Sequence, residues 1–205
     1  MMGKVKTAVL VSGGGTNLQA LIDAQNSGKI KSAEIALVIS NRKQVYALER
    51  ARLAGIPSAV VTRKAAGSRE AFEAGIEALL TEYGIELIVL AGFLAILSED
   101  FTSRHRERIL NIHPSLIPAF CGEGFYGLKV HEAALARGVK VTGATVHFVN
   151  EIPDGGRILL QKAVQVLPGD TPEVLQRRVM EEAEWQLLPA AVEMVASDLA
   201  REEEK

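Results

Sequence analysis

Asn111 and His113 could carry chemistry, because they interrupt an apolar run, ILNIHPSLIP, at residues 109–118. Burying an amide and an imidazole costs free energy unless each finds a partner. In a strand, residues two apart share a face, so both side chains should point the same way just before Pro114 ends the strand. An amide can donate to a developing oxyanion, and an imidazole can donate or shuttle a proton near neutral pH. The alternative is a satisfied pair of core side chains, but the pairing and position favour chemistry.

A proton-handling histidine usually needs a neighbouring acid, and Asp154 in IPDGG is the best candidate. The glycines that follow free the backbone to present Asp154 in a tight loop, although Asp-Gly is also a common turn former. His147, on the preceding expected strand, can support this acid and is interpreted as structural rather than catalytic. Cys121, the one cysteine, excludes an intrachain disulfide and has no obvious basic partner that would make it a nucleophile. The four histidines and this cysteine show no metal-ligand spacing, so no metal is expected.

Three glycines, Gly13 to Gly15, form a second candidate site in VLVSGGGTNLQALI. They follow an expected strand and precede an expected helix, where free N–H groups and a partial positive charge favour a phosphate. The dinucleotide pattern G-x-G-x-x-G fails because Leu18 occupies its last position, and a Walker A loop fails because there is no Gly-Lys-Ser/Thr. A monophosphate cradle remains, to which Thr16 and Asn17 can add donors, and a plain tight turn is the alternative.

The elements that would position these residues follow from the apolar pattern. In the first half, short β-branched runs alternate with helical patterns, which predicts parallel strands joined by right-handed crossovers. The expected strands cover residues 6–12, 33–40, 57–61 and 87–92. The expected helices cover a segment around Leu18, Leu21 and Ile22 that stops near Gly28, and residues 43–54 and 69–83.

The second half begins with a further expected strand at 109–113 and an expected helix at 127–137. After these, strands no longer alternate with helices. Two extended runs, 141–150 and 157–166, flank the turn signal PDGG and predict an antiparallel hairpin. A helix capped by Thr171, with Pro172 at its first position, is expected to run to about residue 198, and REEEK is expected to be a solvated tail. The predicted fold class is α/β: an open, mostly parallel Rossmann-like sheet, with helices on both faces and an antiparallel hairpin near the C-terminal half. Such sheets bind ligands at the carboxyl ends of their strands, where both candidate sites fall.

Composition narrows the function classes. The net charge of the 205 residues is −2 and no basic stripe stands out, so a nucleic-acid partner is not expected. The longest apolar run, 87–97, is too short to span a membrane, and the apolar part of the N-terminus is too short for a secretory signal. A single domain in the cytoplasm is expected.

Four stretches together resemble the phosphoribosylglycinamide formyltransferase family: SGGGTNLQAL, AGFLAIL, NIHPSLIP and VTGATVHFVNEIPDGG. The resemblance runs from about residue 5 to 190. It implies the formyltransferase fold and transfer of the formyl group of 10-formyltetrahydrofolate to the amine of glycinamide ribonucleotide, as in purine biosynthesis, without a metal. It also implies one domain over 1–205, with a nucleotide-binding half at about 1–100 and a folate and catalytic half at about 101–200. Small-molecule substrates, no membrane and a monomer or weak homodimer are expected.

The resemblance assigns roles to particular residues. By motif position, Asn111, His113 and Asp154 form the catalytic set. In the mechanism that these residue types allow, Asn111 and a protonated His113 would stabilise the oxyanion. Asp154 would raise the pKa of His113 and could pass the amine proton through an ordered water to the leaving nitrogen. Gly15, Thr16 and Asn17 would bind the phosphate of glycinamide ribonucleotide. Glu184 would bind its ribose hydroxyls. The folate would be bound by Arg69, Leu94, Ala95, Ile96 and Leu97, with Asn111 near the formyl group.

Two features depart from the family pattern. Relatives often carry an arginine where this chain has Ala95, so a contact with the folate tail is expected to be missing and Arg69 to do more. The stretch at 119–130 is longer and richer in glycine than in some relatives, which affects the shape of a loop near the site. Two other functions stay open on the sequence: a formyltetrahydrofolate hydrolase, with water as the acceptor, and a non-catalytic nucleotide-binding module.

Overall fold

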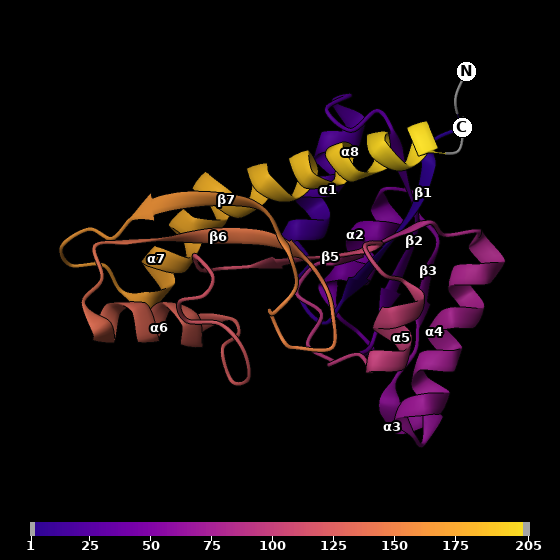
Figure 1. Ribbon diagram of the computed structural model, residues 1–205, viewed down its shortest axis with the longest axis horizontal. Coiled ribbons are helices and arrows are strands. Elements are labelled where there is room, and N and C mark those ends of the chain that lie inside the picture. The colour runs from indigo at the N-terminus through magenta and orange to yellow at the C-terminus, as the bar shows by residue number, and fades with distance from the viewer. Residues whose placement is uncertain (1–2, 203–205) are drawn as a thin grey trace.

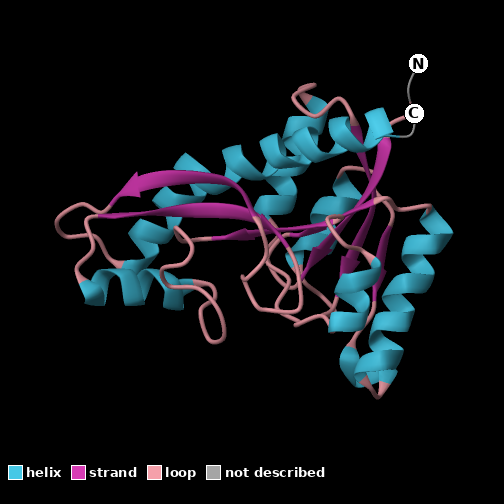
Figure 2. Cartoon of the chain, in the orientation of Figure 1, coloured by secondary structure: helices cyan, strands magenta, loops and turns pink. Residues whose placement is uncertain are grey.

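A seven-stranded sheet forms the centre of the computed structural model, which describes residues 3–202 (Figures 1 and 2). The spatial order is β3-β2-β1-β4-β5-β6-β7; the first five of these strands are parallel, and β6 and β7 are antiparallel to their neighbours. The strands are β1 (Val5–Val11), β2 (Ala33–Ser40), β3 (Ser58–Val60), β4 (Leu87–Leu90), β5 (Ile109–His113), β6 (Val141–Phe148) and β7 (Ile158–Gln165).

Helices cover both faces of this sheet. In Figure 1, α8 lies along one side of the strands, and α3, α4 and α5 gather on the other. The helices are α1 (Thr16–Asn26), α2 (Tyr46–Leu53), α3 (Arg63–Ala66), α4 (Arg69–Tyr83), α5 (Glu99–Arg104), α6 (Leu128–Arg137), α7 (Pro172–Val179) and α8 (Trp185–Glu202), with a π-helical turn at Met180–Glu184 between the last two.

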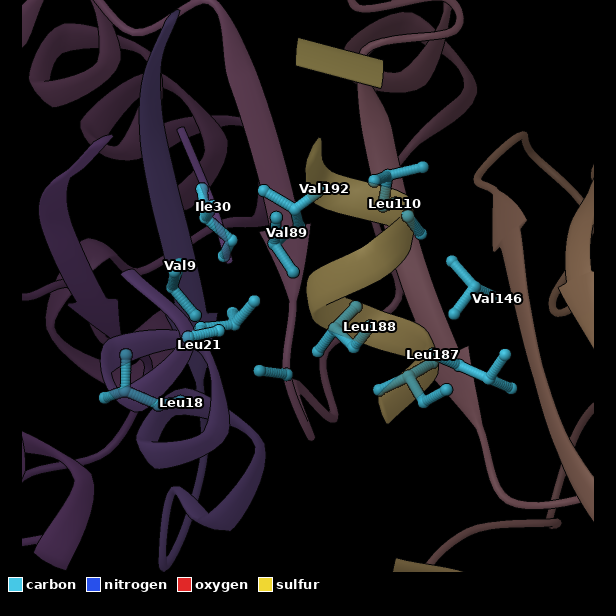
Figure 3. Close-up of a cluster of buried hydrophobic side chains, with 14 of the residues drawn as sticks. Val9, Leu18, Leu21, Ile30, Val89, Leu110, Val146, Leu187, Leu188 and Val192 are labelled. Carbon is cyan, nitrogen blue, oxygen red and sulfur yellow. The ribbon is translucent and has the colours of Figure 1, made fainter. Parts of the chain in front are cut away.

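Strand residues alternate between two buried clusters because successive side chains point to opposite faces. One cluster joins the sheet to α1, α2 and α8. Figure 3 shows Val192 of α8 beside Val89 and Leu110 of β4 and β5, and Leu187 of α8 beside Val146 of β6. The second cluster joins the sheet to α4 and α5. Strands buried on both faces explain the nearly continuous apolar runs of β1 and β4.

Asn111 and His113 lie on the face of the second cluster. Leu110 and Ile112 belong to the first cluster and Ile109 to the second, so the alternation of β5 places the two polar side chains toward α4 and α5. This face of the sheet carries the candidate active site.

The sequence-based prediction of the sheet is confirmed, including the antiparallel hairpin and the strand expected at 57–61, which is β3 at one edge. Two short helices, α3 and α5, were not expected; each begins after a side chain that caps it, Thr62 and Ser98 respectively. The prediction of a single C-terminal helix after Thr171 is wrong in one respect, because the π-helical turn divides it into α7 and α8. The helix continues to Glu202, so only residues 203–205 of the expected tail lie outside the described part of the chain.

Within residues 3–202, no helix combines the length and the apolar character needed to cross a bilayer.

Candidate active site

Asn111 is oriented by a histidine on the neighbouring strand. In the antiparallel pairing of β5 and β6, Asn111 lies opposite His147, and the Asn111 Nδ2 atom is 3.1 Å from His147 Nε2. His147 Nδ1 donates to the carbonyl oxygen of Phe148 at 2.8 Å, which leaves Nε2 as an acceptor in the neutral ring. The amide nitrogen of Asn111 must therefore face His147, and the side-chain amide has one defined orientation.

Asp154 is presented by the loop that connects β6 and β7, and glycines make this presentation possible. Asp154 itself has a φ of 56°, a left-handed conformation that Asp and Asn tolerate better than most residues. A Cβ atom at Gly156 would lie 1.7 Å from the carbonyl oxygen of Phe148, so only glycine fits there. The backbone at Gly156 thus passes close to the backbone at Phe148, and this close approach places the Asp154 carboxylate over the end of β5.

The carboxylate of Asp154 joins the polar side chains into one group. Its Oδ2 atom accepts from the backbone N–H of Gly122 at 2.9 Å and lies 3.4 Å from His113 Nδ1. Its Oδ1 atom lies 3.4 Å from Asn111 Nδ2 and 3.5 Å from His147 Nε2. The structure therefore brings Asn111, His113 and Asp154 together at one point.

His113 is held in its neutral form before any ligand binds. Its Nε2 atom lies 2.8 Å from the carbonyl oxygen of Phe120, which fixes a proton on Nε2 and leaves Nδ1 as the acceptor facing Asp154. Burial lowers the pKa of His113, and this outweighs the upward effects of Asp154 and of the Phe120 hydrogen bond. Asp154 raises the pKa of His113 as expected, but burial has the larger effect and favours the neutral imidazole in the unliganded protein. A protonated His113 at the oxyanion stage stays a prediction about the reaction.

Asp154 stays ionised despite its burial. Burial raises the pKa of Asp154, but the neighbouring histidines, His147 and His113, and the N–H of Gly122 together hold it below its ordinary value. The same carboxylate, added to burial, raises the pKa of Cys121. A higher thiol pKa disfavours the thiolate, so Cys121 is a poor candidate for a nucleophile.

A cavity of about 120 Å³ opens beside these polar groups. Most of its walls are apolar, and Ile96 and Ile152 at its rim are 56% and 57% exposed. His113 does not line the cavity; it is 4% exposed and reaches the cavity through Asp154. The lining residues are Leu90, Phe93, Ala95, Ile96, Leu97, Asn111, His147, Val149, Asn150, Glu151, Ile152, Pro153 and Asp154.

Most of the residues assigned to the folate side lie at this cavity. Ala95, Ile96 and Leu97 line it, whereas Leu94 does not: its backbone N–H donates to Ser12 Oγ at 2.9 Å and its side chain is 46% exposed. Arg69 also lies outside the lining but contacts it, because its Nη2 atom donates to the carbonyl oxygen of Ile96 at 3.2 Å.

The glycine turn leads directly from β1 into α1, and α2 packs against it. Gly15 has a φ of 73°, and a Cβ atom there would lie 2.7 Å from the Cβ atom of Ala47. The N–H of Ala47 donates to the carbonyl oxygen of Gly13 at 3.2 Å, and Arg50 Nε donates to that of Gly14 at 2.9 Å. The conformation of the turn is therefore set by α2 as well as by its glycines.

Replacing Gly15 with Ala is expected to destabilise the protein by about 2 kcal/mol, from a left-handed backbone and a clash with Ala47. Gly14 is the matched control, because a Cβ atom there has no neighbour within 4 Å and its φ is not in the left-handed region. Urea unfolding of both variants measures the effect. Equal stability of Gly15→Ala and Gly14→Ala would contradict this account of the turn.

Asn17 and Glu184 meet at the other side of the turn. Asn17 Nδ2 donates to Glu184 Oε2 at 2.6 Å, and Glu184 is 6% exposed. Burial raises the pKa of Glu184 to about 7, although the Asn17 hydrogen bond acts in the opposite direction. Asn17 Oδ1 is buried and has no hydrogen-bond partner within residues 3–202. Asn17 Oδ1 is therefore free to accept a hydrogen bond from a ligand.

The π-helical turn explains how Glu184 reaches α1. π-Helical turns add a residue to a helix and are frequent at functional sites. Here the turn at Met180–Glu184 lies against the start of α1, where Met180 Sδ is 3.8 Å from Thr16 Oγ1. A larger groove of about 1070 Å³ follows the outer sides of α1 and α8 and reaches Thr16, but none of Asn111, His113 and Asp154 lines it. We therefore place the chemistry at the smaller cavity.

Several groups that the sequence analysis did not assign to chemistry belong to the site. His147 orients Asn111, the backbone of Phe120 fixes the His113 proton, and the N–H of Gly122 binds Asp154. The one sequence signal for His147 was its place on the expected strand at 141–150, just before Asp154. The pairing of this strand with β5, and the register that puts His147 opposite Asn111, come from the structure. Among the residues described, no group of three His, Cys, Asp or Glu side chains is placed to hold a metal ion.

Comparison with known proteins identifies the family. Residues 5–192 match the family described as "Formyl transferase". The chain belongs to this family. It is 45% identical over 187 residues to "Phosphoribosylglycinamide formyltransferase" of Haemophilus influenzae, covering 91% of this chain and 85% of that protein. The crystal structure of "glycinamide ribonucleotide transformylase 1" from Symbiobacterium toebii superimposes with a TM-score of 0.88 at 44% identity, covering 95% of this chain and 89% of the other.

Some members of the family are much longer. This chain is 49% identical over 194 residues to "Trifunctional purine biosynthetic protein adenosine-3" of Gallus gallus, which covers 95% of this chain but 19% of that protein. The chain therefore spans about a fifth of the length of such relatives.

Proposed function

We propose that the protein transfers the formyl group of 10-formyltetrahydrofolate to the amine of glycinamide ribonucleotide, a step of purine biosynthesis. One observation carries this proposal: Asp154 joins Asn111 and His113 beside a cavity with apolar walls. The arrangement supplies an amide donor and an ionised acid, which acyl transfer to an amine requires. The names of the relatives that match most of the chain support glycinamide ribonucleotide as the acceptor.

Asn111 is the donor to the oxygen that becomes negative. Folate supplies the one-carbon unit as a formyl group, and attack of the amine places charge on the formyl oxygen. The Asn111 Nδ2 contact with Asp154 is long, at 3.4 Å, so this N–H is available to a substrate oxygen. His147 holds the amide in the orientation that this role needs.

Asp154 and His113 handle the proton of the attacking amine. Ionised Asp154 lines the cavity and accepts this proton, directly or through a water. His113, neutral in the free protein, can accept the proton at Nδ1, 3.4 Å from the carboxylate. The imidazolium formed in this way keeps a partner for each of its N–H groups, Phe120 and Asp154. When the tetrahedral intermediate collapses, the bond between the formyl carbon and the folate nitrogen breaks. The stored proton goes to that nitrogen, so that neutral tetrahydrofolate leaves.

The cavity walls fit the flat ring of a folate. Ile96, Leu97 and Ile152 provide apolar surface, and the cavity is smaller than a complete ligand site, so it holds the reacting end while the rest lies over the exposed rim. Leu94 and Ala95 complete the segment on this side. Ala95 brings no charge, which leaves Arg69, bound to the carbonyl of Ile96, as the cation for the folate tail.

The nucleotide is proposed to bind at the glycine turn and to reach the cavity from there. Gly15, Thr16 and Asn17 at the start of α1 offer N–H groups to the phosphate. Glu184 accepts hydrogen bonds from the ribose hydroxyls, and Asn17 shifts from Glu184 toward the ligand. The buried Glu184 carboxylate then loses the hydrogen bond from Asn17 and gains hydrogen bonds from the ribose hydroxyls.

The affinity for glycinamide ribonucleotide is expected to weaken about tenfold from pH 8 to pH 6, because Glu184 has a pKa of about 7 and its ionised form is the better acceptor. Proton uptake below pH 7 keeps the carboxyl neutral, so Kd rises as the pH falls. Calorimetric titration measures Kd, and Glu184→Gln serves as the control, since the titration of the ligand itself is common to both proteins. A pH dependence that is the same in the two proteins would remove Glu184 from the ribose site.

One domain over 1–205, with a nucleotide-binding half at about 1–100 and a folate and catalytic half at about 101–200, is part of the proposal. The continuous sheet, with the glycine turn in one half and Asp154 in the other, supports it. A cytoplasmic location and a monomeric or weakly dimeric state stay predictions from the sequence.

A folate assay tests the function. Absorbance follows the formation of tetrahydrofolate from 10-formyltetrahydrofolate with and without glycinamide ribonucleotide. Rapid formation that depends on the nucleotide is expected. Formation without it would indicate the hydrolase, and binding of the nucleotide with no formation at all would indicate the non-catalytic module.

A further inference from the structure

We propose that Glu73, on α4, is a positioning residue that holds the 94–97 segment and Arg69 in place for the folate. The proposal rests on the proposed function, because it assigns a role to the folate side of the same cavity. Glu73 is 5% exposed and takes no part in the chemistry described above. A buried carboxylate is costly unless it is well partnered, so its partners indicate what it does.

The partners of Glu73 lie at one end of the segment. Glu73 Oε1 accepts from the backbone N–H of Ser98 at 2.7 Å, and Glu73 Oε2 accepts from the Ser98 hydroxyl. The same hydroxyl oxygen accepts from the N–H of Phe101 at 3.1 Å and so caps α5. Ser98 is therefore fixed between α4 and α5, directly after Leu97 of the cavity wall.

Arg69 links the carboxylate to the middle of the segment. Its Nε atom lies 3.4 Å from Glu73 Oε1, and its Nη2 atom donates to the carbonyl oxygen of Ile96 at 3.2 Å. The guanidinium thus spans from the buried acid to the cavity rim. Loss of the negative charge at Glu73 would release Arg69 from one of these two attachments.

The other end of the segment is attached to the sheet. The backbone N–H of Leu94 donates to Ser12 Oγ, and Ser12, at the end of β1, is 2% exposed. All three residues between Leu94 and Ser98 line the cavity. Glu73 therefore fixes one of the two anchors of the wall that the folate contacts.

Glu77, one helical turn along α4, provides the comparison. It is an acid on the same side of the helix, but it pairs with His105 at 3.0 Å and with Arg104 at 3.7 Å, away from the cavity wall. Its carboxylate joins α4 to the far end of α5. Removal of its charge perturbs the packing of the same two helices without reaching the 94–97 segment.

The variant Glu73→Gln keeps the size of the side chain and removes its charge. We expect the KM for 10-formyltetrahydrofolate and the Kd for tetrahydrofolate each to rise about tenfold, as for loss of one charge-assisted hydrogen bond. The KM for glycinamide ribonucleotide and kcat should change by less than about twofold, a difference of less than about 0.4 kcal/mol. Ser98→Ala should shift the folate values in the same direction by a smaller factor, and Glu77→Gln should not shift them.

Three outcomes would overturn the inference: unchanged folate binding in Glu73→Gln, an equal rise in both KM values, or the same folate shift in Glu77→Gln. If Glu73→Gln does not fold, Ser98→Ala carries the test, and unchanged folate binding in that variant is contradictory in the same way. Tetrahydrofolate binding separates this inference from the proposed function. A wild-type protein that binds tetrahydrofolate without formylating the nucleotide refutes the function alone, whereas one that binds no tetrahydrofolate refutes both.

Discussion

Replacing Asp154 with Asn is expected to lower kcat by about a thousandfold, because the proton acceptor beside the cavity is lost. The carboxylate contacts Asn111, His113, His147 and the N–H of Gly122. Burial raises the pKa of Asp154, but the two histidines and Gly122 hold it below its ordinary value. Asn keeps the shape and one oxygen but cannot accept the amine proton. Steady-state kinetics with saturating amounts of both substrates measure the change.

Asn is a suitable replacement because the fold should tolerate it. Asp154 has a φ of 56°, and Asn adopts the left-handed conformation readily. The melting temperature should therefore stay close to that of the wild type. An Asp154→Asn protein that folds normally and retains most of its turnover would show that proton transfer does not pass through this carboxylate.

Replacing Asn111 with Ala is expected to lower kcat by about 100-fold to 1000-fold, because the donor to the developing oxyanion is lost. The KM for the folate should change much less, since apolar walls provide most of its contacts at the cavity. Initial rates at varied folate concentration separate the two effects. A variant that raises KM but leaves kcat unchanged would make Asn111 a binding residue only.

A double-mutant cycle tests how Asn111 is oriented. His147→Phe should lower kcat less than Asn111→Ala does, because the amide remains but its orientation is no longer fixed. In the double variant, the loss should be no greater than that of Asn111→Ala alone, since His147 acts through Asn111. Additive losses would instead give His147 a separate role in the reaction.

Much of the sheet and the location of the site could be predicted from the pattern of residues. The alternation within 109–113 and the stop at Pro114 put Asn111 and His113 on one face at the end of a strand. The glycines after Asp154 indicated a tight loop, which the crossing of Gly156 over Phe148 requires. These features depend on local backbone geometry, which residues close together in the sequence determine.

Other features depend on contacts between distant segments and could not be predicted in this way. The pairing of Asn111 with His147 follows from the register of two strands joined through a long connection. The low pKa of His113 follows from burial, which opposes the charge of Asp154 that the sequence suggests. The π-helical turn that brings Glu184 to Asn17 depends on how the C-terminal helices pack on α1, because the residues of the turn form an ordinary helical pattern.

The most direct test of the central claim follows the transferred carbon itself. The protein is incubated with 10-formyltetrahydrofolate that carries ¹³C in the formyl group and with glycinamide ribonucleotide, and the products are analysed by NMR. The account predicts that the label enters the amide of formylglycinamide ribonucleotide, and that Asp154→Asn and Asn111→Ala strongly slow its appearance. Label found only in formate, or label entering the nucleotide at the wild-type rate in both variants, would contradict it.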